Sequence, residues 1–129
     1  MKLLRIDTIY ESDTLTVVCD WRSDRPERVD LDNLIPLDPV VAEIHFFVNG
    51  SFIRKDGNHL SIQDKRAALI AWEKWVREHT YFRVVCNPWD DRDLDMRIRM
   101  FTRLNFDLQN DGSMVLNWKK VYASWKKGN

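Results

Sequence analysis

Two side chains that could transfer a proton, Glu43 and His45, lie two residues apart in the most strand-like segment of the chain. Alternate residues of a strand point to the same face of its sheet, so the carboxylate and the imidazole are expected side by side. Either group can take a proton from an amine or return one to a leaving group. The pair is therefore a candidate general base, and the alternative is a hydrogen-bonded pair on a partly exposed strand face.

A basic loop at residues 54–59, Arg-Lys-Asp-Gly-Asn-His, follows this strand and precedes a predicted helix. Successive backbone N–H groups at the start of a helix form a binding site for phosphate. Gly57 would let the backbone approach the phosphate closely, and Arg54 and Lys55 would add positive charge. The alternative is a solvated turn. No second histidine lies at metal-ligand spacing from His59, so no metal site is predicted.

The periodicity of apolar residues predicts the elements that position these residues. Between residues 40 and 48, apolar residues at even positions alternate with Glu43 and His45, as in a half-buried strand. Ser61 begins the strongest helical pattern, whose apolar stripe is centred on Trp72 and Val76. In chain order the predicted elements are strands 3–10, 14–21 and 40–49, a helix over 61–80, a strand over 81–86, a helix over 94–104 and a strand over 113–125.

The order of these elements, ββ-β-α-β-α-β, predicts a single α/β domain with one mixed sheet and helices packed on it. The strand–helix–strand unit over 40–86 predicts two parallel strands joined by a right-handed crossover. Residues 22–39 contain three prolines and many charges, so a surface loop is expected there. Six tryptophans predict a core built on large rings, although Trp89 and Trp125 lie in polar surroundings that favour an interaction surface.

Composition excludes several classes of protein. The 129 residues include 20 Lys or Arg and 20 Asp or Glu, and a net charge of zero disfavours a nucleic-acid-coating protein. Residues 1–50 nevertheless hold ten acidic and five basic side chains, and the remainder holds the opposite excess. No apolar run approaches the roughly 20 residues of a membrane span, and early charge at Arg5 and Asp7 predicts no signal peptide. A cytoplasmic protein with two free, buried cysteines, Cys19 and Cys86, is expected.

Residues 42–106 resemble the GNAT family of N-acetyltransferases, in particular its small phage-encoded members. The strand 42–45 (Ala-Glu-Ile-His) resembles their central strand, and the loop 54–59 resembles the family's Arg/Gln-x-x-Gly-x-Gly/Ala loop. Residues 97–106 resemble the family's later helix and the Gly-Phe pair that follows it, here Asn105-Phe106. The likeness covers about half the chain and depends on the order and spacing of the three motifs.

The resemblance implies that acetyl-coenzyme A lies between two splayed parallel strands and that its acetyl group passes to an amine of a small molecule or protein. Glu43, directly or through water, or His45 would be the base. The residues that this resemblance assigns to the cofactor are Phe47, Val48, Arg54, Lys55, Gly57, Asn58, His59 and Leu60.

Three departures from the family pattern favour a rival interpretation. His59 replaces a small residue of the phosphate loop, Phe101 replaces the tyrosine that often serves as general acid, and Asn105 replaces a glycine, which is tolerable at positive φ. The rival is a catalytically degenerate GNAT-fold phage protein that binds a phage or host protein, as a head-assembly or virion accessory. In that case the protein is expected in the host cytoplasm or the virion, and exposed Trp89 and Trp125 could report a homodimer.

Overall fold

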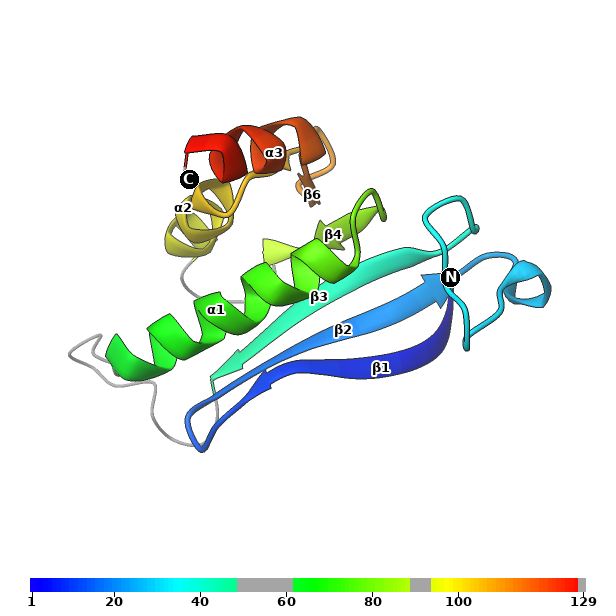
Figure 1. Ribbon diagram of the computed structural model, residues 1–129, viewed down its shortest axis with the longest axis horizontal. Coiled ribbons are helices and arrows are strands. Elements are labelled where there is room, and N and C mark those ends of the chain that lie inside the picture. The colour runs from blue at the N-terminus through cyan, green and yellow to red at the C-terminus, as the bar shows by residue number, and fades with distance from the viewer. Residues whose placement is uncertain (49–61, 89–93, 128–129) are drawn as a thin grey trace.

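A computed structural model describes residues 1–48, 62–88 and 94–127 and forms one six-stranded mixed sheet with three α-helices (Figure 1). The α/β class expected from the sequence is confirmed. No described helix is both long and apolar enough to cross a membrane. The strands are β1 (Lys2–Glu11), β2 (Leu15–Ser23), β3 (Val41–Val48), β4 (Val84–Cys86), β5 (Phe106–Leu108) and β6 (Met114–Leu116), and the helices are α1 (Ile62–Glu78), α2 (Leu94–Arg103) and α3 (Trp118–Lys127).

The long strands β1, β2 and β3 form an antiparallel meander at one side of the sheet, whose full order is β1-β2-β3-β4-β6-β5. Odd-numbered residues of β2 from Leu15 to Trp21 are buried, as are Ala42 and Ile44 of β3. These are the positions that alternation along the sequence predicts. Glu43 and His45 consequently project from the opposite face.

The strand–helix–strand unit predicted in the middle of the chain is confirmed as a parallel pair. Strand β3 ends at Val48, α1 begins at Ile62, and β4 lies beside β3 with Ala42 opposite Val84 and Ile44 opposite Cys86. Strand β4 lies between β3 and β6, so it is central in the sheet. Its short apolar sequence matches this position, because a central strand has neighbours on both edges.

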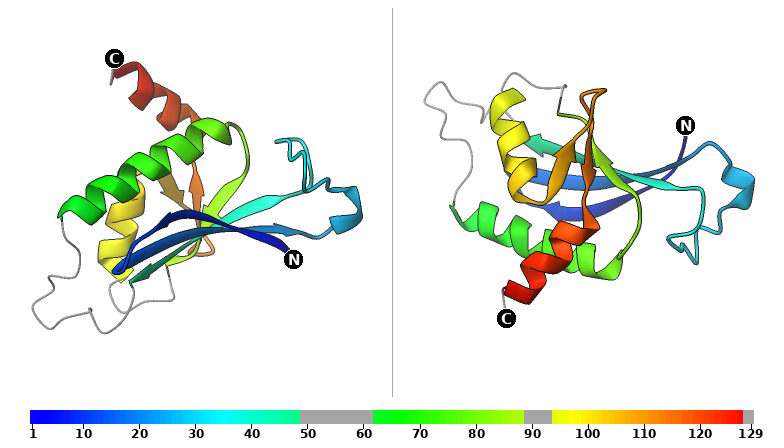
Figure 2. Two further views of the ribbon diagram at one scale, coloured as in Figure 1. Left: turned by 60° about the horizontal axis from the view of Figure 1, so that its bottom comes forward. Right: turned by 90° about the horizontal axis from the view of Figure 1, so that it is seen from above.

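Helix α1 packs across the sheet (Figures 1 and 2), and a cluster of buried aromatic rings lies between them. Trp72 and Trp75 are buried on its inner face, and their rings stack at a centroid distance of 5.5 Å. Trp21, which is completely buried on β2, contacts Trp75 at 6.1 Å and Phe82 at 5.2 Å. The buried stripe of α1 is shorter than the helix, because Ile62 in its first turn is 67% exposed.

Both cysteines are free and buried, as predicted. They lie on different strands, Cys19 on β2 and Cys86 on β4. Burial is the main cause that raises the thiol pKa of both residues, to about 12 for Cys86. A thiol whose pKa is raised this far stays protonated and unreactive near neutral pH.

The strand predicted over 113–125 is wrong beyond residue 116. Strand β6 ends at Leu116, and residues 118–127 form α3. The Asn117 side chain accepts a hydrogen bond from the backbone N–H of Lys120 at 3.2 Å, which caps the new helix. Strand β5 was also missed, because it is only three residues long and directly follows the turn at Asn105.

The first turn of α1 is tied to the β1–β2 hairpin through Asp64. The carboxylate accepts hydrogen bonds from the Tyr10 hydroxyl at 2.7 Å and from the Thr14 hydroxyl. Donation by Thr14, and then by Tyr10, lowers the pKa of Asp64. This contact fixes where α1 begins relative to the end of the sheet nearest residues 49–61.

Replacing Asp64 with Asn should lower the melting temperature near neutral pH and have no effect in acid. A carboxylate whose pKa is lowered on folding stabilises the protein at any pH above its unfolded-state pKa of about 3.9. This contribution is lost as the pH falls through the folded-state pKa. Thermal unfolding near neutral pH and below about pH 3 measures the difference. Asp13→Asn, in the same hairpin but exposed, is the control. An Asp64→Asn effect of equal size at both pH values would contradict the prediction.

Candidate functional site

Four polar side chains from β2 and β3 meet on the sheet face opposite α1. The antiparallel register sets Asp20 opposite Glu43, with His45 and Arg22 one step away on the same face. Each of the four is partly or largely buried, and Asp20 is only 8% exposed. Charged groups with so little solvent access must be satisfied by one another. We call these four residues the β2–β3 polar cluster.

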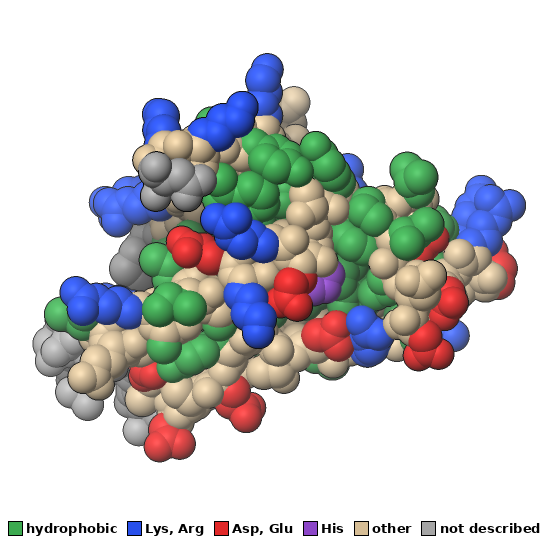
Figure 3. Space-filling model, in the orientation of Figure 1, with side chains coloured by type: hydrophobic (Ala, Val, Ile, Leu, Met, Phe, Trp, Pro, Cys, Tyr) green, Lys and Arg blue, Asp and Glu red, His purple; other side chains and the backbone are tan. Residues whose placement is uncertain are grey.

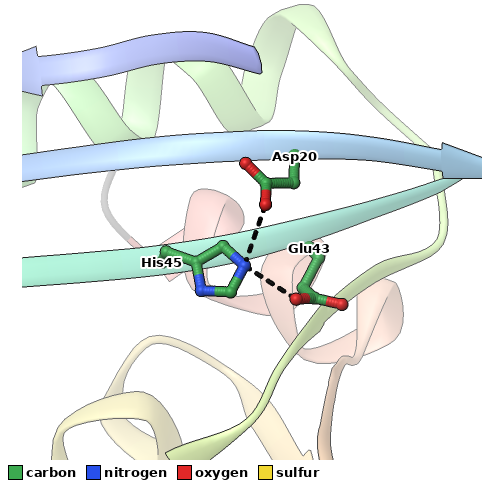
Figure 4. Close-up of side chains that lie close together, drawn as sticks. All are labelled: Asp20, Glu43 and His45. Atoms are coloured by element: carbon green, nitrogen blue, oxygen red, sulfur yellow. Dashed lines mark ion pairs between the residues drawn. The ribbon is translucent and has the colours of Figure 1, made fainter. Parts of the chain in front are cut away.

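The imidazole of His45 lies between the two carboxylates (Figure 4). Its Nε2 atom is 2.7 Å from Glu43 Oε1 and 3.2 Å from Asp20 Oδ2. This nitrogen is shielded from solvent, and neither carboxylate oxygen is aligned for a regular hydrogen bond. A proton on Nε2 would therefore lie near two carboxylate oxygens without a regular hydrogen bond to either.

Arg22 holds both carboxylates from the side. Its Nη2 atom is 3.2 Å from Asp20 Oδ2, and its Nε atom is 3.7 Å from Glu43 Oε2. The guanidinium balances one of the two negative charges, and a protonated imidazole would balance the other. The four side chains therefore sum to a net charge of −1 with a neutral imidazole and to zero with a protonated one.

Asp20, Glu43 and His45 are also the described side chains that could hold a metal ion. Each offers one ligand atom, and the three atoms lie within 4.8 Å of one another. Imidazole and carboxylate are ordinary ligands for a divalent transition metal. The guanidinium of Arg22 competes with such an ion, because it already lies against both carboxylates.

The edge of β3 that extends beyond its pairing with β4 lies beside this cluster, and we call this unpaired edge the opening. The pairing of β3 with β4 ends at Ile44 and Cys86, whereas β3 continues to Val48 with β2 as its partner. In the described part of the chain, no strand pairs with the other edge of residues 45–48. Arg97 of α2 lies at this opening, with its guanidinium carbon 5.6 Å from the centre of the Phe46 ring.

The residues expected to hold a cofactor are only partly described. Phe47 is half exposed, and its ring stacks on that of His45 at 6.1 Å. Val48 is the last residue of β3. The loop residues Arg54, Lys55, Gly57, Asn58, His59 and Leu60 lie outside the described residues, as does Trp89.

No family model, curated protein or solved structure matches this chain. The geometry of the β2–β3 polar cluster and of the opening beside it therefore carries the functional argument.

Sequence reasoning found two members of the cluster and missed the other two. Glu43 and His45 were predicted from alternation along β3, and the structure brings them together. Asp20 and Arg22 alternate with buried residues of β2 in the same way, and this pattern was the available signal. Their place beside Glu43 depends on the β2–β3 register, which an intervening segment of 17 residues between Ser23 and Val41 does not specify.

Proposed function

We propose that this chain is a GNAT-like acyltransferase domain that transfers an acetyl group from acetyl-coenzyme A to an amine. One observation carries the proposal: the parallel pairing of β3 with β4 ends after three residues, directly beside the Glu43–His45 pair, while β3 continues to Val48. The GNAT resemblance implies an acyl-coenzyme A ligand between two splayed parallel strands. The unpaired edge of residues 45–48 offers backbone N–H and C=O groups that a pantetheine arm could pair with.

The order of elements around this opening supports the same proposal. Residues 49–61 connect β3 to the start of α1, so the predicted phosphate loop joins the end of β3 to a helix N-terminus. On the other side, Arg97 contributes a positive charge near Phe46 and Cys86. Burial raises the pKa of Cys86, and the charge of Arg97 opposes this with a smaller effect that lowers it. A ligand with phosphates at one end would meet favourable charge on both sides.

The cluster provides the proton chemistry that acetyl transfer requires. The amine must lose a proton as its nitrogen attacks the thioester carbonyl, and the carbon–sulfur bond then breaks to release a thiolate. In this proposal Glu43 accepts the amine proton, directly or through water, and His45 shares it with Asp20. Arg22 keeps the two carboxylates in place. The thiolate takes its proton from solvent, because Phe101 has none to give.

Calorimetric titration with acetyl-coenzyme A tests the proposed function. We expect micromolar binding that is lost in Gly57→Glu, because a carboxylate in the predicted phosphate loop repels the ligand. Asn33→Glu adds the same charge at an exposed residue between β2 and β3 and should leave binding unchanged. Absence of a binding signal at about 1 mM ligand would overturn the proposal, because it would mean a binding free energy weaker than about −4 kcal/mol.

One observation favours a second candidate, a GNAT-like scaffold that binds a phage or host protein without catalysis. Phe101, at the position of the family's usual tyrosine, is 5% exposed and packs edge-on against Phe106 at 5.3 Å. That side chain serves the core and leaves the position without an acid. Asn105, in contrast, has φ of 74°, so it replaces the family's glycine without a change in backbone shape. Acetyl-coenzyme A binding without turnover is the result that this candidate predicts.

A further inference from the structure

A shallow hollow lies between the end of α1 and α3, away from the proposed acetyl-transfer site. It has a volume of about 580 Å³ and is lined by Tyr81, Lys119, Tyr122, Ala123 and Lys126. This volume is within the range of about 300–1,000 Å³ found for ligand sites. Figure 3 shows apolar side chains gathered over this part of the molecule, with Lys and Arg side chains around them.

Tyr81 forms one wall of the hollow at a cost in backbone energy. Its φ is 69°, in the left-handed region, where glycine or asparagine is favoured after a helix. A bulky residue in this region is an outlier, because its Cβ lies too close to the backbone carbonyl oxygen. Burial does not offset this cost, because Tyr81 is 63% exposed. The ring is nevertheless held in place, since it contacts Trp118 at 6.1 Å and Tyr122 at 5.6 Å.

The opposite wall is one face of α3 with a lysine at each end. Lys119 and Lys126 are seven residues apart, about 10 Å along a helix, with Tyr122 and Ala123 between them. In the part of the chain that the structure describes, no carboxylate lies within ion-pair distance of either lysine. Lys120, which does not line the hollow, is by contrast paired with Asp107 at 2.5 Å.

The charge of this region selects the kind of ligand. Residues 112–127 contain four lysines and no Asp or Glu. A patch of this size is small for nucleic acid, which is bound through many phosphate contacts, and the first fifty residues carry an acidic excess. Alternate side chains of an extended peptide point to the same face, so two carboxylates four residues apart lie about 13 Å from each other with one side chain between them on that face. The two flexible lysine side chains, about 10 Å apart at the helix, can reach both carboxylates.

We propose that this hollow binds a short acidic segment of a partner protein. Two carboxylates four residues apart would pair with Lys119 and Lys126, and an apolar side chain midway between them, on the same face of the peptide, would pack on Tyr81 and Tyr122. The rings of Tyr81 and Tyr122 lie 5.6 Å apart, centre to centre, and form an apolar wall. Tyrosine and tryptophan are the side chains most enriched in such contacts.

Fluorescence anisotropy with the labelled peptide Gly-Glu-Ser-Phe-Ser-Glu-Gly tests this site on the full chain. We expect saturable binding with a dissociation constant below about 1 mM and at least about fivefold weaker binding of Gly-Gln-Ser-Phe-Ser-Gln-Gly. Lys119→Gln/Lys126→Gln should lose binding by a similar factor. Lys120→Gln/Lys127→Gln makes the same change in net charge on the same helix outside the hollow and should retain binding.

Tyr81→Gly separates a binding role from a structural one. Glycine suits the left-handed backbone, so the melting temperature should stay the same or rise while peptide affinity falls at least about fivefold. Tyr81→Asn, which also tolerates this backbone, should behave alike. Equal affinity in the two lysine double variants, equal binding of the two peptides, or tighter binding of single-stranded oligothymidine would each overturn the proposal.

Discussion

Replacing Trp21 with alanine should lower the free energy of unfolding by about 3–5 kcal/mol, the range for a large ring removed from a core. Trp21 is completely buried on β2, and its ring contacts Trp75, His79 and Phe82. Its Nε1 atom also donates a hydrogen bond of 2.8 Å to Asp7 on β1. The side chain therefore joins β1, β2, α1 and the turn before β4, and a cavity there would loosen all four.

Denaturant unfolding of the Trp21→Ala variant measures this loss against a total stability that is typically about 5–15 kcal/mol. Trp125→Ala is the matched control, because Trp125 is only half buried and contacts Arg77 across its ring at 4.4 Å. We expect the control to lose less than about 2 kcal/mol. A Trp21→Ala loss of the same size as the control would show that the aromatic cluster does not hold the sheet to α1.

The elements that could be predicted are those with a long, one-sided apolar pattern. Alternation over residues 15–21 and 40–48 predicts two strands with the correct buried faces, because one face of each packs on the core, from Leu15 to Trp21 and from Val40 to Ile44. The helical stripe around Trp72 is equally clear where α1 is buried. Such patterns are set by burial, so they are strongest where these elements cover the core.

The C-terminal region could not be predicted in the same way. Residues 114–116 are apolar, and Asn117 ends this apolar run. Apolar residues then recur at helical spacing, at Trp118, Val121, Tyr122 and Trp125. Because aromatic and β-branched residues are common in strands, composition favours one long strand. The side chain of Asn117 decides otherwise, since it caps α3 and also donates to Asp107 of β5 at 2.7 Å. This contact joins segments that a local pattern treats separately.

The candidate site was predictable along a strand but not across strands. The Glu43–His45 pair follows from the two-residue period of β3, whereas Asp20 and Arg22 enter through pairing with β2. This distinction matters for mechanism. Considered only along β3, Glu43 is a carboxylate on the outer face of a strand. With Asp20, His45 and Arg22 it belongs to a partly buried cluster of charged groups.

Under the proposed acyltransferase function, Glu43→Gln should reduce the rate of acetyl transfer by about 10²–10⁴-fold while acetyl-coenzyme A affinity stays constant. Glutamine keeps the shape of the side chain and its place beside His45 but cannot accept the amine proton. Release of the coenzyme A thiol, with spermidine and a lysine peptide as acceptors, measures the rate, and calorimetry measures the affinity.

Two further variants distinguish the base from its supports. Asp20→Asn leaves Glu43 intact but removes one partner of His45 Nε2, so its effect should be smaller than that of Glu43→Gln. Asp107→Asn is the matched control, because this carboxylate also contacts a cation, Lys120, but lies on β5 away from the opening. If Glu43→Gln and Asp107→Asn transfer acetyl groups at equal rates, Glu43 is not the base. The β2–β3 polar cluster would then be a structural ion network, held together by the ion-pair contacts among its own four members.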